Sequence, residues 1–325
     1  MLSNFTYVRP KSLDEVFKHL SSEGSRVHAG GTDLLGCLRE HIFDASKVVS
    51  LSSVKGLRGI RKSSRGGLTI GALTTLREVE GHSEVIKSYT ALAQAASDVA
   101  SPQLRNQGTL GGNLCQKPRC WYYRGDFLCL RKGGEECYAV AGENAFHCIF
   151  GGESCYIVHP SDTASALGAL AARVYIRGPK GQRSVALENF HVPPSEDYRK
   201  ETCLARGEIV TEIELPLPAE GLRSSYRKVR ARRSWDFALA GVALALVFKG
   251  DQVQSARVFL SGVAPVPWRS TEVEEVVTGK RLDEATARKA GEAAVQKAQP
   301  LEQNGYKIPL LRGLVEEQLL VLARG

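Results

Sequence analysis

The sequence lacks any long hydrophobic run, and it lacks repeats. No apolar stretch reaches the ~18–20 residues that a bilayer span requires, so we expect no membrane span. The start, MLSNFTYVRPKSLDEVF, has no short apolar core of the secretory type, so we expect no export signal in the chain itself. There is no internal repeat or low-complexity tract, and 43% hydrophobic with 24% charged residues excludes a disordered or fibrous chain.

Two familiar kinds of site are also missing. The seven histidines have no metal-ligand spacing, and no Ser-His-Asp grouping can be assembled from the sequence. The cysteines show no paired Cys-x-x-Cys of a zinc ribbon, and the glycines of residues 29–33 do not have the spacing of a dinucleotide fingerprint.

Positive charge is in excess, with a net charge of +8, so acidic ligands, phosphates and nucleic acid are all considered as partners. Six of the cations lie in residues 223–233. This run is interpreted as a nucleic-acid face, as a cation lining a ligand pocket, or as a solvated surface. In a strand Tyr226, Lys228 and Arg230 would share one side, which marks Lys228 as an inward-facing charge.

A length of 325 residues predicts two domains, or one domain with a large insertion. Ser12 and Glu15, like Thr75 and Glu78, form the pattern of a helix-capping box, and a helical period runs from Val85 to Val99. Helices alternate with strands and glycine turns, which favours an α/β or α+β domain. After a linker at 216–221 we expect three strands, at 225–229, 240–248 and 256–262, backed by helices.

Three polar turns are candidate ligand sites. Gly30 and Gly31 follow a predicted strand, where main-chain amides can approach an anion such as a diphosphate; the alternative is a plain tight turn. A second glycine turn, 108–113, adds a threonine and an asparagine that can bond a sugar, a phosphate or a flavin edge. In 159–162, His-Pro-Ser-Asp, helix capping and binding of ribityl or ribose hydroxyls are compatible interpretations.

The cysteines are crowded: six of eight fall within residues 115–155, in a stretch from 108 to 156 that has no persistent periodicity. Cys120, Cys129, Cys137 and Cys155 can hold a 4Fe-4S cluster or a zinc ion, or can be reduced structural cysteines, and the spacing leaves the three open. A disulfide knot is disfavoured without a secretory signal. Cys37 and Cys203 are isolated and are expected to be buried.

Taken in order, AGGTDLL (29–35), NQGTLGGNLC (106–115), HPSD (159–162), EIVTEIELPLP (208–218) and RKVRARRSWDFALAGVALAL (227–246) resemble the FAD-binding subunit of the molybdenum hydroxylases. This family includes xanthine dehydrogenase, carbon monoxide dehydrogenase medium subunits, aldehyde oxidoreductases and 4-hydroxybenzoyl-CoA reductase. The resemblance implies an α+β chain with a two-part FAD-binding domain of the vanillyl-alcohol-oxidase/PCMH type at 1–217, its subdomains at about 1–55 and 56–217. A smaller domain of a three-stranded sheet plus helices follows at 222–325.

The resemblance also implies the FAD-binding residues. The segment 27–34 would cradle the diphosphate, and the turn 108–113 would approach the diphosphate and the flavin. Asp162 would bind flavin-chain hydroxyls. Lys228 would lie near the flavin ring, where its charge would stabilise the anionic reduced form. Thr32-Asp33 stands where xanthine dehydrogenases have Thr-Glu. The implied cofactor residues are Val27, His28, Ala29, Gly30, Gly31, Thr32, Asp33, Leu34, Val99, Gly108, Thr109, Gly111, Gly112, Asn113, Ser161, Asp162, Val210 and Lys228.

The insert at 115–156 resembles that of the family branch whose flavin subunit also carries a 4Fe-4S cluster, as in periplasmic aldehyde oxidoreductases and 4-hydroxybenzoyl-CoA reductase. Matched by position, Cys120, Cys129, Cys137 and Cys155 take the ligand places, while Cys115 and Cys148 fall outside the pattern.

The implied function is electron transfer in a heterotrimer, with no general acid or base in this chain. A large molybdenum-cofactor subunit would act on the substrate, and a small subunit with two 2Fe-2S clusters would relay electrons to FAD and on to an external acceptor or donor. We expect a cytoplasmic location, or a periplasmic one by co-export on a partner's signal.

Two alternatives remain open. One is a self-sufficient flavin oxidase with the same FAD-binding fold. The other is a basic zinc-binding nucleic-acid protein, which would explain the net charge and the cysteines but not the glycine turns.

Overall fold

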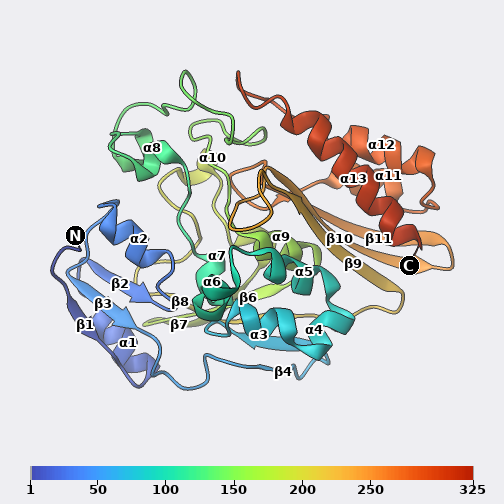
Figure 1. The fold of residues 1–325 in the computed structure, drawn as a ribbon. Coiled ribbons are helices and arrows are strands. Elements are labelled where there is room, and N and C mark those ends of the chain that lie inside the picture. The colour runs from blue at the N-terminus through green and yellow to red at the C-terminus, as the bar shows by residue number, and fades with distance from the viewer. Residues whose placement is uncertain (1, 325) are drawn as a thin grey trace.

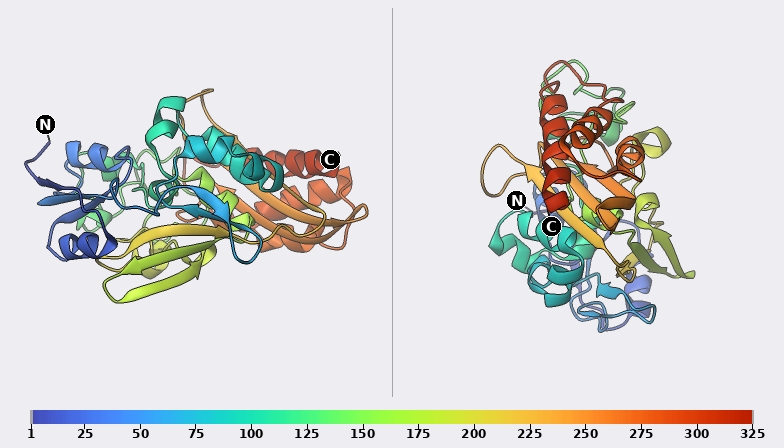
Figure 2. Two further views of the ribbon diagram at one scale, coloured as in Figure 1. Left: turned by 90° about the horizontal axis from the view of Figure 1, so that it is seen from below. Right: turned by 90° about the vertical axis from the view of Figure 1, so that its right-hand side faces the viewer.

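The structure is a computed structural model that describes residues 2–324. Three sheets with helices between them form an elongated molecule, with a three-stranded sheet at one end and the C-terminal helices at the other (Figures 1 and 2). The predicted α+β class, with a smaller C-terminal part, is confirmed. No helix within residues 2–324 is both long enough and apolar enough to cross a membrane.

The N-terminal sheet is parallel and carries a helix on each face. Successive residues of a strand point to opposite faces, so Val49 packs with Val16 of one helix while Val48 packs with Leu38 of the other. The strands, in sheet order, are β1 (Thr6–Val8), β3 (Lys47–Ser50) and β2 (Ser25–His28), and the helices are α1 (Leu13–Leu20) and α2 (Leu34–Arg39).

The second sheet is antiparallel and has five strands. Its core is shared with small-residue helices that pack against it and against the third sheet. The strands, in sheet order, are β4 (Ile60–Lys62), β5 (Leu68–Gly71), β8 (Ile209–Leu215), β6 (Arg173–Gly178) and β7 (Gly181–Ala186). The helices are α3 (Leu76–Gly81), α4 (Ser83–Ser88), α5 (Thr90–Asp98), α6 (Pro102–Gln107), α7 (Leu110–Leu114), α9 (Asp162–Ala169) and the short η2 (Leu187–Asn189).

Two local predictions need correction. The period from Val85 to Val99 is not one helix, because Tyr89 separates α4 from α5; its backbone leaves the helical region and its buried hydroxyl donates to the Pro216 carbonyl. At Ser12 only half of the capping box forms: the hydroxyl accepts from the Glu15 amide, but the Glu15 carboxylate binds the Lys11 amide. Tertiary contacts and neighbouring donors override the local pattern.

The C-terminal sheet is antiparallel and contains a fourth, two-residue edge strand besides the three expected. Along its central strand the residues alternate between two cores: Ala243 and Ala245 face α5 and α9, while Val242 and Leu244 face the C-terminal helices. The strands, in sheet order, are β12 (Trp268–Arg269), β11 (Gln252–Ser261), β10 (Ala240–Lys249) and β9 (Leu222–Val229), and the helices are α11 (Thr271–Val277), α12 (Glu284–Ala294) and α13 (Lys307–Arg324).

The cysteine-rich insert has almost no regular structure, as expected from its lack of periodicity. It contains only α8 (Trp121–Arg124) and the single turn η1 (Leu130–Lys132), and a short helix, α10 (Pro194–Asp197), lies nearby. The insert lies between α2 and the start of α13 (Figure 1). It therefore connects the N-terminal sheet with the C-terminal helices.

Candidate functional site

The turn between β2 and α2 carries backbone amides that no protein group uses. Within residues 2–324, the amide nitrogens of Gly30, Gly31, Thr32 and Asp33 have no hydrogen-bond acceptor. Gly31 has a φ of 75°, and a side chain at Gly30 would overlap the carbonyl oxygen of Gln107. Unpaired amides on a glycine turn form an anion-binding concavity. The turn therefore has the chemistry to bind a phosphate or diphosphate.

The second glycine turn uses its amides differently. Leu110 and Gly111 donate to the carbonyls of Thr74 and Ala72, each at 2.9 Å, and Gly112 donates to the Thr109 hydroxyl at 3.1 Å. Gly108 and Gly111 are buried, and the turn contacts the first one through Gln107 and Gly30. This turn is thus a wall of the site, since its own amides are satisfied by the protein.

Asn113 joins the second turn to the third predicted element. Its Oδ1 accepts hydrogen bonds from the hydroxyls of Ser161, at 2.5 Å, and Thr163, at 2.7 Å. Ser161 also caps α9 by accepting from the Ala164 amide, so the capping interpretation is correct. The Nδ2 group of Asn113 has no acceptor within the described chain, which leaves it free to donate to a ligand.

A buried ion pair lies beside this junction. Lys228 Nζ is 2.7 Å from Asp162 Oδ2, Tyr226 donates its hydroxyl proton to Asp162 Oδ1 at 2.6 Å, and the two charged side chains are 1% and 6% exposed. Burial raises the pKa of Asp162, and the neighbouring ammonium and phenol oppose that rise. The alternation of β9 had correctly placed Tyr226 and Lys228 on one inward side; Arg230 instead pairs with Asp98.

Asp33 is committed to the insert. Its carboxylate accepts hydrogen bonds from the Lys117 amide, at 2.7 Å, and from the Arg124 guanidinium, at 2.8 Å, and it forms an ion pair with Arg119 at 3.0 Å. The resemblance had placed Asp33 among the cofactor residues. The structure gives its carboxylate two hydrogen bonds and an ion pair within the protein, so Asp33 links the first turn to the residues before and after Cys120.

The other predicted cofactor residues surround these contacts. His28 packs edge-on against Tyr7, and burial lowers its pKa. Val27 is exposed on β2, Val99 is half-buried where α5 ends, and Val210 is buried in β8. Ala29 and Leu34 flank the first turn.

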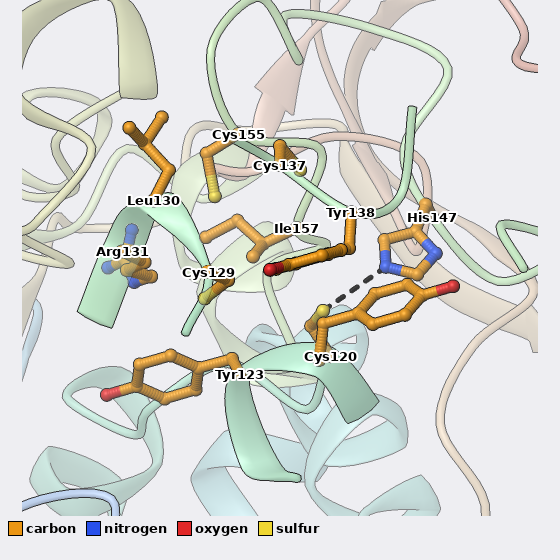
Figure 3. A pocket seen from close by; sticks show the side chains of 11 residues that line it. Cys120, Tyr123, Cys129, Leu130, Arg131, Cys137, Tyr138, His147, Cys155 and Ile157 are labelled. Carbon is orange, nitrogen blue, oxygen red and sulfur yellow. Dashed lines mark hydrogen bonds between the residues drawn. The ribbon is translucent and has the colours of Figure 1, made fainter. Parts of the chain in front are cut away.

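The four cysteines assigned as cluster ligands line one cavity (Figure 3). Cys120 precedes α8, Cys129 precedes η1, and Cys137 and Cys155 come from the irregular segments around them. The rest of the lining is mostly aromatic or basic: Tyr122, Tyr123, Leu130, Arg131, Tyr138, His147 and Ile157. Residues 35 positions apart in the sequence therefore meet at one place.

The thiols in this cavity interact with each other. Interaction between the Cys137 and Cys155 side chains lowers the pKa of Cys137 and raises that of Cys155. Burial raises the pKa of Cys120 to about 11, and the buried Arg131 guanidinium, paired with Glu201, favours the thiolate of Cys155. The thiolate, and not the thiol, is the form of cysteine that binds metal.

The remaining cysteines do not line the cavity. Cys148 is completely buried, and burial raises its pKa and that of Cys115 to about 12. Cys37 is buried as expected, but Cys203 is only half-buried and lies 3.9 Å from the Arg183 guanidinium. None of the eight forms a disulfide within the described residues.

The cavity is not built around one metal ion. Across residues 2–324, no group of three or more His, Cys, Asp or Glu side chains has the geometry to hold a single ion. The four cysteines line one cavity, but no three of them are placed to ligate one ion, as a tetrahedral zinc site requires.

Two residues of the site, Tyr226 and His147, were not assigned to it from the sequence. Tyr226 was placed on the inward side of a strand, and a hydroxyl there was a signal for a hydrogen bond to Asp162. His147 lines the cavity 3.3 Å from the Cys120 sulfur, and burial lowers its pKa to about 4. Nothing in its local sequence predicted that contact.

Comparison with known proteins adds the family. Residues 3–218 match the family described as the FAD binding domain in molybdopterin dehydrogenase, and residues 224–320 match the CO dehydrogenase flavoprotein C-terminal domain. The chain is 35% identical over 315 residues to the aldehyde oxidoreductase FAD-binding subunit PaoB of Escherichia coli, covering 95% of both chains.

The chain also matches more distant relatives over most of its length. The chain is 27% identical to a carbon monoxide dehydrogenase medium chain of Hydrogenophaga pseudoflava, covering 92% of this chain and 88% of the relative. The solved carbon monoxide dehydrogenase from the same organism superposes with a TM-score of 0.79 at 25% identity, covering 99% of this chain and 98% of the other. Quinoline 2-oxidoreductase from Pseudomonas putida gives 0.78 at 26% identity, covering 100% and 99%.

Proposed function

The chain belongs to the family of FAD-binding subunits of the molybdenum hydroxylases, and from this we propose that it is the electron-transfer subunit of such a complex, holding FAD and one 4Fe-4S cluster. Electrons would pass between 2Fe-2S clusters of a small partner subunit, the FAD of this chain and an external acceptor or donor. The substrate chemistry would take place on a large molybdenum subunit. The observation that carries the proposal is the convergence of the glycine turns, Asn113, Asp162 and Lys228 beside a four-cysteine cavity.

The residues at the first turn fit a diphosphate. The four unpaired amides at 30–33 would bind its oxygens, and Asn113 Nδ2 would donate to a neighbouring oxygen of the ligand. Arg119, whose buried Nε has no partner within the described residues, adds positive charge beside this turn. The bound flavin would supply the exchange between one-electron and two-electron carriers.

Lys228 would supply a fixed positive charge at the flavin. Asp162 and the Asp236 carbonyl hold its ammonium group in place, and both charged side chains are buried. A charge in a buried, poorly solvated place acts strongly on a neighbouring group. Lys228 would therefore favour the more negative, reduced state of the flavin.

The cysteine cavity fits a 4Fe-4S cluster better than a zinc ion. In such a cluster each cysteine ligates the cube at a different iron atom, so the sulfurs surround a space and need not meet at one point. The shared cavity of Cys120, Cys129, Cys137 and Cys155 supports this assignment, and Arg131 beside them would offset part of their negative charge. We assign these four as ligands, and Cys115 and Cys148 as structural.

The proposal divides the chain into a flavin-binding domain at 1–217, which includes the insert at 115–156, and a C-terminal domain at 222–325; the family matches at 3–218 and 224–320 support this division. We place assembly of the cofactors in the cytoplasm; if the complex is exported, it would leave folded with its partners.

The test is analysis of the full chain purified without oxygen. We expect released FAD at about one per chain and acid-labile iron and sulfide at about four per chain. FAD without iron would overturn the cluster assignment and favour a flavin oxidase. Colourless protein containing zinc would overturn the whole proposal in favour of the nucleic-acid alternative.

Electron routing needs the assembled complex. Reducing the molybdenum partner with its substrate should bleach the flavin absorbance of this chain in a rapid-mixing experiment. If the flavin stays oxidised while the partner's 2Fe-2S clusters are reduced, the proposed route is wrong.

A further inference from the structure

His147 is the one nitrogen ligand-type side chain at the cysteine cavity among the described residues, and it contacts a cysteine directly. Its Nε2 is 3.3 Å from Cys120 Sγ, the contact drawn in Figure 3. The ring is buried at 4% exposure and packs edge-on against Trp121, with centroids 5.2 Å apart. The aromatic packing fixes the ring plane, so the nitrogen stays directed at the sulfur.

The polarity of this contact follows from the partners. As a ligand of the proposed cluster Cys120 would be a thiolate, which has no proton and can only accept, so Nε2 would donate. Nδ1 of His147 is buried and has no partner within residues 2–324, which is compatible with the tautomer that carries its proton on Nε2. With the cluster bound, the 3.3 Å contact would therefore be an N–H···S hydrogen bond from His147 to Cys120.

The backbone of His147 is held by the C-terminal part of the chain. Asn304, which is completely buried, donates from Nδ2 to the carbonyls of His147 and Cys148, each at 3.1 Å. Lys307, also completely buried, donates from Nζ to the carbonyls of Phe146, at 3.1 Å, and Gly262, at 2.7 Å.

A reciprocal pair completes this clamp, which we define as the contacts of residues 303–307 with residues 144–148. The Asn144 amide donates to Gln303 Oε1 at 3.1 Å, and the Gln303 amide donates to Asn144 Oδ1 at 2.9 Å. Side chains from the end of the molecule thus replace the secondary structure that this part of the insert lacks.

We propose that His147 is a positioning residue that raises the reduction potential of the iron–sulfur cluster through its hydrogen bond to Cys120, and that the clamp holds it there. The inference rests on the proposed function, since it needs the cluster. Reduction adds one electron and makes the cysteine sulfurs more negative, so a donor at Cys120 stabilises the reduced state more than the oxidised one. Hydrogen bonds to the sulfurs are among the factors that set cluster potentials.

The experiment is a redox titration of the cluster in the purified full chain, followed by electron paramagnetic resonance. His147→Phe keeps an aromatic ring but removes the donor. We expect the equilibrium constant for reduction to fall by about tenfold, which is about 59 mV for a one-electron couple. His147→Gln keeps an N–H donor and should return the potential most of the way. His19→Phe, at the far end of α1, is the matched control and should leave it unchanged.

The outcomes separate this inference from the proposed function. Absence of iron and sulfide from the wild-type chain would overturn the cluster itself. A wild-type chain with its cluster, and His147→Phe with iron and FAD retained and an unshifted potential, would overturn the role of His147 alone.

If the His147→Phe variant loses its cluster, the potential is measured in Asn304→Ala instead. This variant keeps the imidazole but removes the hydrogen bond from Asn304 to the His147 carbonyl. A lowered potential in Asn304→Ala supports the inference, and an unchanged potential refutes it.

Discussion

The first glycine turn, residues 30–33, and the cysteine insert touch at Asp33 but are ordered in different ways. The turn lies between a strand and a helix whose residues pack on both faces of a sheet, so its shape is fixed before any ligand binds. The insert has two short helical segments and is held by the clamp, by Asp33 and by a charged contact between Arg131 and Glu201. Hydrophobic side chains such as Phe127, Leu128 and Phe146 remain exposed on it.

The difference teaches where cofactor and fold depend on each other. The first turn would bind its ligand through backbone groups, which a side-chain substitution does not remove. It is therefore most sensitive to substitutions that add atoms to its glycines. The insert would bind its cofactor through cysteine side chains. It is therefore most sensitive to the substitution of any one of these cysteines. We therefore expect substitutions in the two regions to separate flavin content from iron content.

The largest effect is expected in the insert. Cys129→Ser should reduce the iron content from about four per chain to nearly none, because the cluster needs four thiolates. FAD content should stay close to that of the wild type, since the first turn does not use the insert cysteines. Iron and flavin analysis of the same preparation checks this. Cys203→Ser, outside the cavity, is the control; equal loss of flavin in Cys129→Ser would show that the two regions are not separable.

The next largest effect is expected at the buried ion pair of Asp162 and Lys228. Asp162→Ala leaves the Lys228 ammonium buried without its carboxylate, which should lower the free energy of unfolding by about 3–5 kcal/mol. Urea unfolding of the purified chain measures it. The double change Asp162→Leu with Lys228→Met removes both charges and should regain most of that loss. A single variant as stable as the wild type would contradict the buried pair.

Gly30→Ala tests the space at the first turn. Its methyl group would overlap the Gln107 carbonyl and push the two turns apart, so FAD affinity should fall by about a hundredfold, or about 2.7 kcal/mol, while iron stays bound. Flavin fluorescence titration of the deflavinated chain measures the affinity. Gly36→Ala is the matched control in α2, because the nearest atom to its added carbon, Arg124 Nη1, is 4.0 Å away. Equal FAD affinities of Gly30→Ala and Gly36→Ala would contradict the role of the space at Gly30.

The smallest effect concerns acid, at the boundary of the two regions. His159 and His191 are buried with ring centroids 4.2 Å apart, and burial lowers the pKa of His191 to about 4. The folded protein therefore binds fewer protons than the unfolded chain between pH 4 and about 6.5. The stability is fully present above pH 6.5 and falls as the pH is lowered.

Between pH 7 and pH 5, His191 alone should contribute a loss of about 2 kcal/mol. Urea unfolding at the two pH values measures it, and His191→Gln, which can still donate to the Leu114 carbonyl but does not titrate, should show a smaller loss. The same pH dependence in both proteins would exclude His191 as its source.

How far the sequence predicted this molecule depends on the type of interaction. Hydrophobic periodicity and turn residues predicted most strands and helices, because both are local. The break at Tyr89 depended on a hydrogen bond to Pro216, and the edge strand β12 on its pairing with β11, and neither is visible in a local pattern.

The site divides in the same way. Gly30, Gly31 and the four cysteines could be proposed from the sequence because the proposed functions restrict the residue type. The partner of Asp33, the contact of His147 with Cys120 and the anchor of Asn304 were not, because each joins residues far apart in the sequence through one side chain. The departure from Thr-Glu to Thr-Asp was the only local sign that position 33 differs.

The alternating faces of β10 have a practical consequence. Its alanines close the core over α5 and α9, while its larger residues close a second core under α11–α13, so the C-terminal sheet cannot hinge outward without baring both. A chain that ends after Pro218 would expose hydrophobic side chains of its core and would lose the contacts that hold residues 144–148. The two halves should accordingly be expressed, transplanted or redesigned only as a unit.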